Sequence, residues 1–218
     1  MRLDEALPML RAACGKPFKD LFIGHPENLR TNKGNVGQLL LTYAGLKLDS
    51  NLLDFDDGEL KTNKSKSDGS PIETMFITQI SKNIDTFISH TRTPFEESNL
   101  YIKTRNLIYL PVVKNTENAA DWYFTECVHV KMTPNSSFYK KMREDYHVIG
   151  EGLKKHIESS HDGFIHTTNG LHYVQVRSKD SKPYHPIYSN HYGRYVSNKN
   201  HALYFMKSFM KDAVSGKL

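Results

Sequence analysis

Short apolar runs of two different periodicities alternate along this chain of 218 residues, which leaves few kinds of fold open to it. Apolar residues spaced three or four apart predict helices over residues 3–13, 36–45 and 138–157 and around Phe209. Alternating or β-branched apolar runs predict strands over residues 59–62, 72–80, 102–113, 122–132 and 173–177. Helices and strands that alternate in this way favour one α/β domain.

The connections between these runs carry further expectations. The segment NKSKSDGSP at 63–71 has strong turn chemistry, so we expect the strands at 59–62 and 72–80 to form a hairpin with a long loop. Residues 17–32 lack a clear period and are expected to be mostly irregular. Asn135 or Ser136 is the expected N-cap of the long helix.

The composition excludes several classes of protein. Every apolar run is far shorter than the roughly 20 residues that a membrane span needs, and the charged N-terminus does not read as a signal peptide. The cysteines are Cys14 and Cys127, which excludes a disulfide framework and a four-cysteine zinc site. We therefore expect no membrane partner and a reducing, cytoplasmic location of prokaryotic or phage type.

Positive charge is concentrated at the C-terminal end. The net charge is +5, and residues 177–218 hold eight Lys or Arg residues against two Asp residues. Tyrosines and histidines are interleaved with these charges, as on a folded nucleic-acid surface, whereas a disordered arm would contain few aromatic residues. A solvated basic tail is the alternative on charge alone.

The segment DFDDGELKT at 54–62 carries the most chemical information. On a strand, Glu59 and Lys61 point to one face while Leu60 points to the other. Two carboxylates such as Asp54 and Glu59 offer hard oxygen ligands to Mg²⁺, and a nearby lysine can hold an attacking water. This is the D-x(n)-E-x-K arrangement of metal-dependent nucleases, although the tripeptide alone also fits a solvated, ion-paired strand face.

Several blocks in the same order carry a resemblance to a known family. They are PENLRTNKGNVGQLL at 26–40, DFDDGELKT at 54–62, PIETMFI at 71–77, SNLYIKTRNLIYLPV at 98–112, YVQVRSK at 173–179 and HALYFMKSF at 201–209. With these blocks the chain resembles the MutH-type endonuclease family, which includes the mismatch-repair endonuclease and type II restriction enzymes that cut GATC. The resemblance implies a restriction-endonuclease-like (PD-(D/E)xK) mixed sheet flanked by helices, with two lobes around a DNA cleft. It further implies one domain over 1–218, with residues 135–218 as a candidate DNA-recognition lobe.

The resemblance also assigns roles to residues. Asp54, Glu59 and Lys61 match the catalytic residues, with Asp54 and Glu59 as Mg²⁺ ligands, and Lys103 matches an additional lysine in the family's next strand. The residues expected to bind DNA are Lys33 near the backbone, Arg177, Ser178 and Lys179 in the base-reading segment, Tyr204 near the adenine methyl position, and Lys207 at a phosphate.

Three departures from the family pattern qualify these roles. The interval between aspartate and glutamate is shorter here, so Asp56 or Asp57 is an alternative to Asp54 as ligand. Leu41 stands where the family usually has a glutamate, which puts a second metal or a water-positioning role in doubt. Ser178 replaces a proline between the arginine and the lysine, which leaves a target site other than GATC open.

Three functions follow, with double-stranded DNA as the partner in each. The first is a Mg²⁺-dependent restriction endonuclease, and binding to DNA as a homodimer is compatible with this function. The second is a mismatch-repair nickase that needs a protein activator, and the third is a DNA-binding module that has lost cleavage. Other candidate residues favour structural roles: His156, Glu158 and His161 have the wrong spacing for a zinc protease, Cys127 fits a core strand, and His201 fits the surface.

Overall fold

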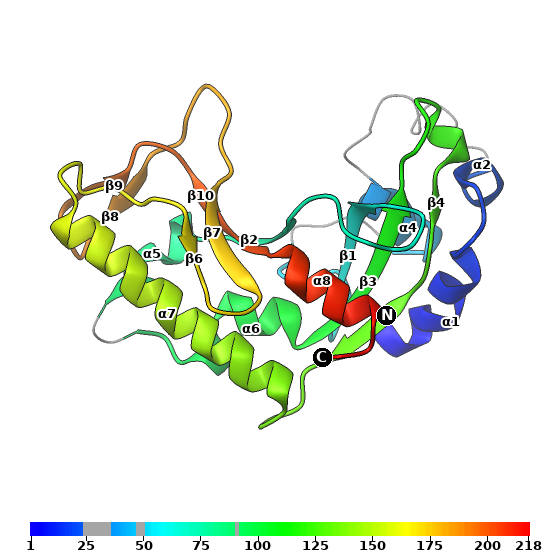
Figure 1. The fold of residues 1–218 in the computed structure, drawn as a ribbon, viewed down its shortest axis with the longest axis horizontal. Coiled ribbons are helices and arrows are strands. Elements are labelled where there is room, and N and C mark those ends of the chain that lie inside the picture. Colours follow the sequence, from blue (N-terminus) through cyan, green and yellow to red (C-terminus); the bar gives the residue numbers. More distant parts are fainter. Residues whose placement is uncertain (24–35, 47–50, 90–91) are drawn as a thin grey trace. The chain divides into compact units, whose positions relative to one another are not determined.

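The computed structural model describes residues 1–23, 36–46, 51–89 and 92–218, which form a mixed α/β fold with several sheets (Figure 1). The chain divides into two compact units, each assembled from segments that are distant in sequence. The first unit comprises Met1–Met75, Lys103–Met132 and Met210–Leu218, and the second comprises Phe76–Ile102 and Thr133–Phe209. The predicted α/β class is confirmed at this level.

The first unit is built on the buried strand β3 (Asn106–Val113). Strand β1 (Glu59–Ser65) runs parallel to it on one side, and β4 (Tyr123–Phe124) and β5 (Val128–Lys131) run antiparallel on the other. Because side chains alternate across a strand, one face of β1 and β3 joins the hydrophobic core. The helices α1 (Leu3–Ala13), α2 (Phe18–Leu21) and α4 (Val36–Tyr43) contribute their buried residues to the same core.

The second unit contains a sheet with the strand order β2-β10-β7-β6 and a separate hairpin of β8 and β9. Its strands are β2 (Met75–Gln79), β6 (Thr168–Asn169), β7 (Val174–Ser178), β8 (Ile187–Ser189), β9 (Arg194–Ser197) and β10 (His201–Phe205). Its helices are α5 (Ile84–Ile88), α6 (Asn99–Thr104), α7 (Ser137–Ser159) and α8 (Lys207–Val214), of which α6 and α8 extend into segments of the first unit.

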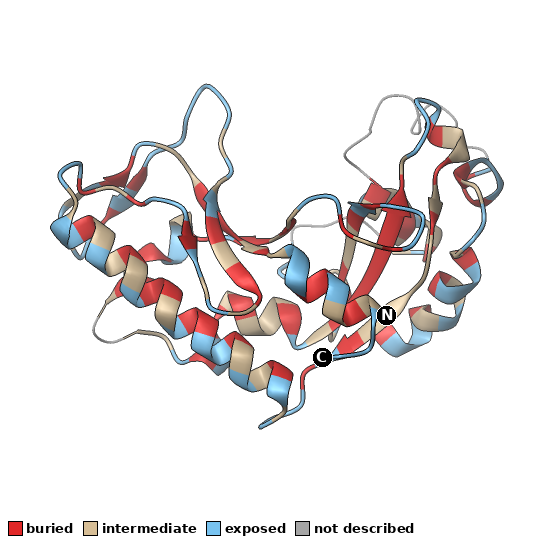
Figure 2. Cartoon of the chain, in the orientation of Figure 1, coloured by how far each residue is buried: buried red, intermediate tan, exposed pale blue. Residues whose placement is uncertain are grey.

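The long helix α7 agrees with its sequence pattern. The Ser136 side chain accepts a hydrogen bond from the Tyr139 N–H, as an N-cap should. Its buried residues form one stripe that faces the sheet, while the opposite side is exposed (Figure 2). At Gly152, which is partly buried on this helix, a Cβ would come within 2.8 Å of Thr168 Cγ2 on β6, so the helix and the sheet pack closely.

The expected hairpin of residues 59–62 and 72–80 is wrong. Strand β1 continues to Ser65 and pairs with β3, whereas β2 pairs with β10 in a different sheet. The turn itself is shorter than expected, with the Gly69 N–H donating to Lys66 O and Gly69 at a φ of 79°. The strand period was read correctly, but strand partners are chosen by packing between segments distant in sequence.

Three other boundaries differ from the prediction. Residues 99–104 form α6, so the run at 102–113 becomes a strand only from Asn106. The run at 122–132 is split into β4 and β5 opposite Pro111, which has no N–H to donate to the ladder. The segment expected to be irregular contains the short helix α2. No helix within the described ranges is long and apolar enough to cross a membrane.

Candidate functional site

Glu59, Lys61 and Lys103 come together in the first unit. Glu59 is only 2% exposed, and its Oε1 lies 2.5 Å from Lys61 Nζ and 2.8 Å from Lys103 Nζ. Alternation along β1 places Glu59 and Lys61 on one face, while Leu60 is buried in the hydrophobic core. The structure therefore brings both predicted lysines into direct contact with the predicted glutamate.

The second oxygen of Glu59 has different surroundings. Glu59 Oε2 is buried and has no hydrogen-bond partner among the residues that the structure describes. Buried polar atoms are nearly always paired with protein, water or an ion, because an unpaired one is costly to desolvate. This oxygen is therefore a natural contact point for a ligand.

Asp54 is the second carboxylate of the cluster. Its Oδ2 accepts a hydrogen bond from the Leu60 N–H at 3.0 Å, so the loop carboxylate is tied to β1 directly after Glu59. Burial raises the pKa of Asp54, and the negative charge of Glu59 raises it further. The Leu60 N–H and the charges of Lys61 and Lys103 oppose that shift in pKa, so Glu59, Lys61 and Lys103 all lie close enough to Asp54 to influence its charge.

The neighbouring aspartates have other partners. Asp56 Oδ2 lies 2.9 Å from the Met1 ammonium nitrogen. Asp57 Oδ1 accepts from the Leu3 N–H at 2.8 Å, and its Oδ2 lies 3.0 Å from an Arg2 guanidinium nitrogen. Both carboxylates are thus engaged by the N-terminal segment, and this favours Asp54 over the two alternatives.

Three predicted positions need comment. Lys103 reaches Glu59 as expected, but it does so from α6 and not from the predicted strand. Leu41 lies on α4 and packs against the hydrophobic core of the first unit. Lys33 lies outside the described residues.

The predicted base-reading residues lie on β7 and β10 of the second unit. The antiparallel register places Ala202 opposite Arg177 and Tyr204 opposite Gln175, so Arg177, Gln175 and Tyr204 lie on one face of the sheet. Arg177 is exposed and Tyr204 is partly buried. Burial raises the pKa of Tyr204, and the charge of Arg177 opposes that shift. Tyr173, directly before β7, is buried.

Phe76 belongs to this surface and was missed from sequence. Lys179 Nζ lies 3.7 Å from the centroid of the Phe76 ring, and the Phe76 and Tyr204 rings meet edge to face with centroids 5.8 Å apart. An aromatic residue in an apolar strand gives no sequence signal of such a role. Ser178 ends β7, and Lys207 is exposed at the start of α8.

The remaining candidates have structural surroundings. Glu158 accepts a hydrogen bond from Tyr192 at 2.7 Å, and His161 is exposed near the end of α7. Cys127 lies between β4 and β5 and packs against the core of the first unit. His201 was expected at the surface, but it is 2% exposed and its Nδ1 lies 3.1 Å from Ser197 Oγ, so that expectation is wrong.

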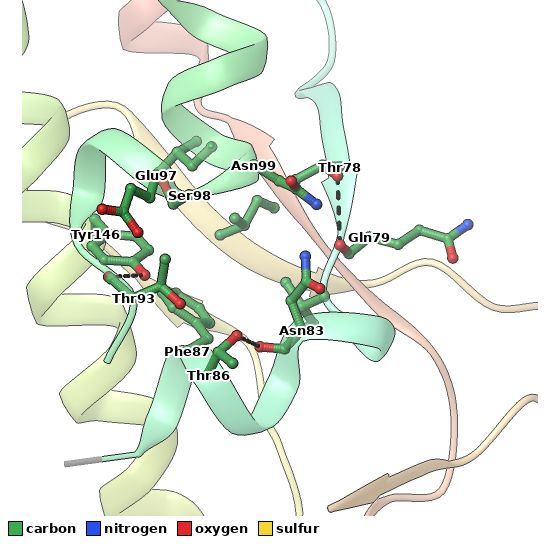
Figure 3. Close-up of a pocket in the computed structure, with 13 residues that line it drawn as sticks. Thr78, Gln79, Asn83, Thr86, Phe87, Thr93, Glu97, Ser98, Asn99 and Tyr146 are labelled. Atoms are coloured by element: carbon green, nitrogen blue, oxygen red, sulfur yellow. Dashed lines mark hydrogen bonds between the residues drawn. The ribbon is translucent and has the colours of Figure 1, made fainter. Parts of the chain in front are cut away.

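A separate pocket of about 290 Å³ lies in the second unit (Figure 3). Its lining combines carboxamide and hydroxyl side chains, among them Asn83, Asn99 and Thr78, with the rings of Phe87 and Tyr146. The Tyr146 hydroxyl donates to Thr93 O at 2.8 Å, which fixes that wall. None of the predicted site residues lines this pocket, so it does not bear on the charged cluster.

The residues of the cluster fit a magnesium ion. Mg²⁺ is usually held by one or two carboxylates together with waters and substrate phosphates. Asp54 and Glu59 supply that pair, including Glu59 Oε2, for which the described part of the chain offers no hydrogen-bond partner. No larger group of His, Cys, Asp or Glu side chains suited to a metal occurs within the described ranges. No family model matches the chain, and no curated protein matches it either.

Proposed function

We propose that this chain is a Mg²⁺-dependent endonuclease that cuts double-stranded DNA at a specific sequence, GATC or a related site. The observation that carries the proposal is the Glu59 carboxylate, held by Lys61 and Lys103 beside Asp54, with one buried oxygen that has no hydrogen-bond partner among the described residues. The resemblance to the MutH-type family and its restriction-endonuclease-like core, with action in the cytoplasm, forms part of the same proposal.

Each residue of the cluster has a role in phosphodiester hydrolysis. Asp54 and Glu59 would hold Mg²⁺, which when bound stabilises charge on a phosphate and makes a bound water more acidic. Lys61 and Lys103 lie at the same carboxylate and offset the negative charge that develops on the phosphate oxygens. Burial of Glu59 strengthens these interactions, since charges act more strongly where water is excluded.

The face formed by Arg177, Gln175, Tyr204 and Phe76 supports sequence-specific binding. An arginine fork pairs in a bidentate manner with the two guanine acceptors in the major groove. Lys207, exposed at the start of α8, is suited to a phosphate, which fixes position but carries no sequence information. The net charge of +5 favours a polyanionic partner.

Leu41 supports a second candidate, a DNA-binding module without cleavage, because an apolar residue packed in the core replaces the family's glutamate. A plasmid assay with purified protein and Mg²⁺ separates the alternatives. Linear product from GATC-bearing plasmid supports the restriction enzyme. A nick confined to hemimethylated plasmid, dependent on a protein activator, supports the repair nickase. Tight specific binding without any cut supports the binding module.

A further inference from the structure

We propose that Asn106 is a positioning residue that holds the loop of residues 54–58, and thereby Asp54, in place for the metal. This inference rests on the proposed function. Asn106 begins β3, one residue before Leu107, which pairs with Glu59. Its Nδ2 donates to Asp57 O at 3.0 Å, and its Oδ1 lies 2.8 Å from His129 Nε2 on β5.

These two contacts fix the orientation of the Asn106 carboxamide. A backbone carbonyl only accepts, so the group facing Asp57 O must be the NH₂, and the oxygen must then face His129. His129 Nε2 therefore carries the proton that it donates. Burial lowers the pKa of His129, and Nε2–H donates in the neutral tautomer as well as in the cation. The two hydrogen bonds that join His129 of β5 to Asn106 and Asn106 to Asp57 are called the clamp below. They have one consistent set of donors and acceptors.

The loop is tightly packed at Gly58. A Cβ at Gly58 would lie 2.7 Å from Asn106 O and 2.3 Å from Leu3 Cδ1, so the backbone runs directly against the start of β3. Within the loop, the Phe55 N–H donates to Gly58 O at 2.9 Å. Asp54 is in turn tied to β1 through the Leu60 N–H. A displacement of Asp57 is therefore passed to Asp54 through a short, closed turn.

The substitution Asn106→Asp isolates this role. Aspartate has the same shape and still accepts from His129, but it has no N–H for Asp57 O and places a negative oxygen against that carbonyl. Loss of a group that orients a metal ligand commonly weakens metal affinity about 10–100-fold. We expect a weakening of that size for Asn106→Asp.

Mn²⁺ serves as the probe, with its binding to DNA-free protein followed by electron paramagnetic resonance. Asn106→Asp should bind Mn²⁺ about 10–100-fold more weakly than wild type, and Glu59→Gln should lose the site. Asn118→Asp is the matched control, because Asn118 also makes two side-chain hydrogen bonds in the first unit, to Ala120 N–H and to Asp121. Wild-type affinity in Asn106→Asp, or equal losses in Asn106→Asp and Asn118→Asp, would overturn the proposal.

A second variant covers the case in which Asn106→Asp does not fold. His129→Leu removes only the outer donor of the clamp, and we expect Mn²⁺ affinity to fall a few-fold and the Leu60 amide to exchange faster with solvent. Unchanged affinity and exchange in His129→Leu would contradict the clamp. If wild type binds Mn²⁺ through Glu59 yet cuts no DNA, the endonuclease proposal fails while the role of Asn106 stands. If wild type binds no Mn²⁺, the role of Asn106 fails.

Discussion

The two oxygens of the Glu59 carboxylate are used differently. Oε1 contacts two lysines, and Oε2 is buried without a described hydrogen-bond partner. A purely structural ion pair on a strand would not need to bury its carboxylate to 2% exposure, because solvated pairs contribute little to stability and buried ones cost desolvation. The arrangement supports the proposed site, which a cation and a phosphate would complete.

Single substitutions in the loop of residues 54–58 test which aspartate serves the site. We expect Asp54→Asn to lose Mg²⁺-dependent cleavage, whereas Asp56→Asn and Asp57→Asn keep most of it, because Asp56 and Asp57 contact the N-terminal segment. Cleavage rates at saturating DNA measure this. An inactive Asp57→Asn together with an active Asp54→Asn would show that the ligand has been misassigned.

Asp54→Asn should also raise the stability of the metal-free protein at neutral pH. Burial and the charge of Glu59 raise the pKa of Asp54 above its ordinary 3.8, so the folded state binds this proton more tightly than the unfolded state. The free energy of unfolding therefore falls as the pH rises from 3.8 through the folded pKa, and the amide removes that loss. Thermal melts of both proteins at pH 7 with chelator provide the measurement. A lower melting temperature in Asp54→Asn than in wild type would contradict the claim that the ionised Asp54 carboxylate destabilises the metal-free protein.

At the scale of single residues, the sequence predicted the contacts between residues that are close together in the chain. The spacing of Glu59 and Lys61 predicts a shared strand face, and the structure has them in contact. The contacts of Asn106 with Asp57 and of Phe76 with Lys179 could not be predicted, because these partners are distant from them in the sequence. Such proximity is set by tertiary packing and leaves no periodic signal.

At the scale of elements, β7 depends on Asp145 of α7. Asp145 is fully buried, and its carboxylate accepts hydrogen bonds from the backbone N–H groups of His172, Tyr173 and Val174. A Cβ at Gly170 would lie 2.5 Å from Asp145 Oδ1, so the approach to β7 is packed against this carboxylate. The start of the strand that carries Arg177 is thus anchored by this carboxylate in addition to its pairing with β10.

Removing that carboxylate should destabilise the second unit. Asp145→Ala leaves buried backbone donors unpaired, and we expect a loss of about 3 kcal/mol in the free energy of unfolding. Chemical denaturation followed by circular dichroism checks this value. Asp68→Ala is the control, since Asp68 is exposed and accepts from the Ser70 N–H in a turn, and its midpoint should stay close to that of wild type. Equal shifts in the two variants would contradict the account.

β7 also carries the prediction about recognition. We expect Arg177→Ala to weaken binding to specific DNA by about 1–3 kcal/mol while changing nonspecific binding little. Lys207→Ala should weaken both alike and reduce the salt dependence by about one phosphate contact. Competition binding at several salt concentrations separates the two effects. If Arg177→Ala weakens specific and scrambled duplexes equally, the segment is a phosphate clamp.

Helices and strands were predicted well where residues within the element itself determine its type and its ends. The helix over Ser137–Ser159 has a cap and a full apolar stripe, and both were visible in the sequence. The strand partners of β1 and β2 were not, because parallel pairing of β1 with β3 requires a long connection that turn chemistry at 63–71 does not reveal. Pro111 splits β4 from β5 across the sheet, and that effect is likewise invisible in the run at 122–132 itself.

At the scale of the whole molecule, the charged cluster and the residues predicted to read bases belong to different compact units. Each unit is assembled from separate segments, so neither corresponds to a contiguous stretch such as 135–218. The proposed function therefore assigns hydrolysis to groups of the first unit and sequence recognition to groups of the second. Variants of one unit should consequently affect one property and leave the other nearly intact.

Cleavage of GATC-bearing plasmid by β1 variants, with DNA binding measured in parallel, tests the central claim most directly. The account predicts that Glu59→Ala and Lys61→Ala each lower the cleavage rate by about 10²–10³-fold while DNA affinity stays near that of wild type. Lys64→Ala, at an exposed position on the same strand, should cut at the wild-type rate. Wild-type cleavage by Glu59→Ala or Lys61→Ala would remove this strand from the chemistry and contradict the account.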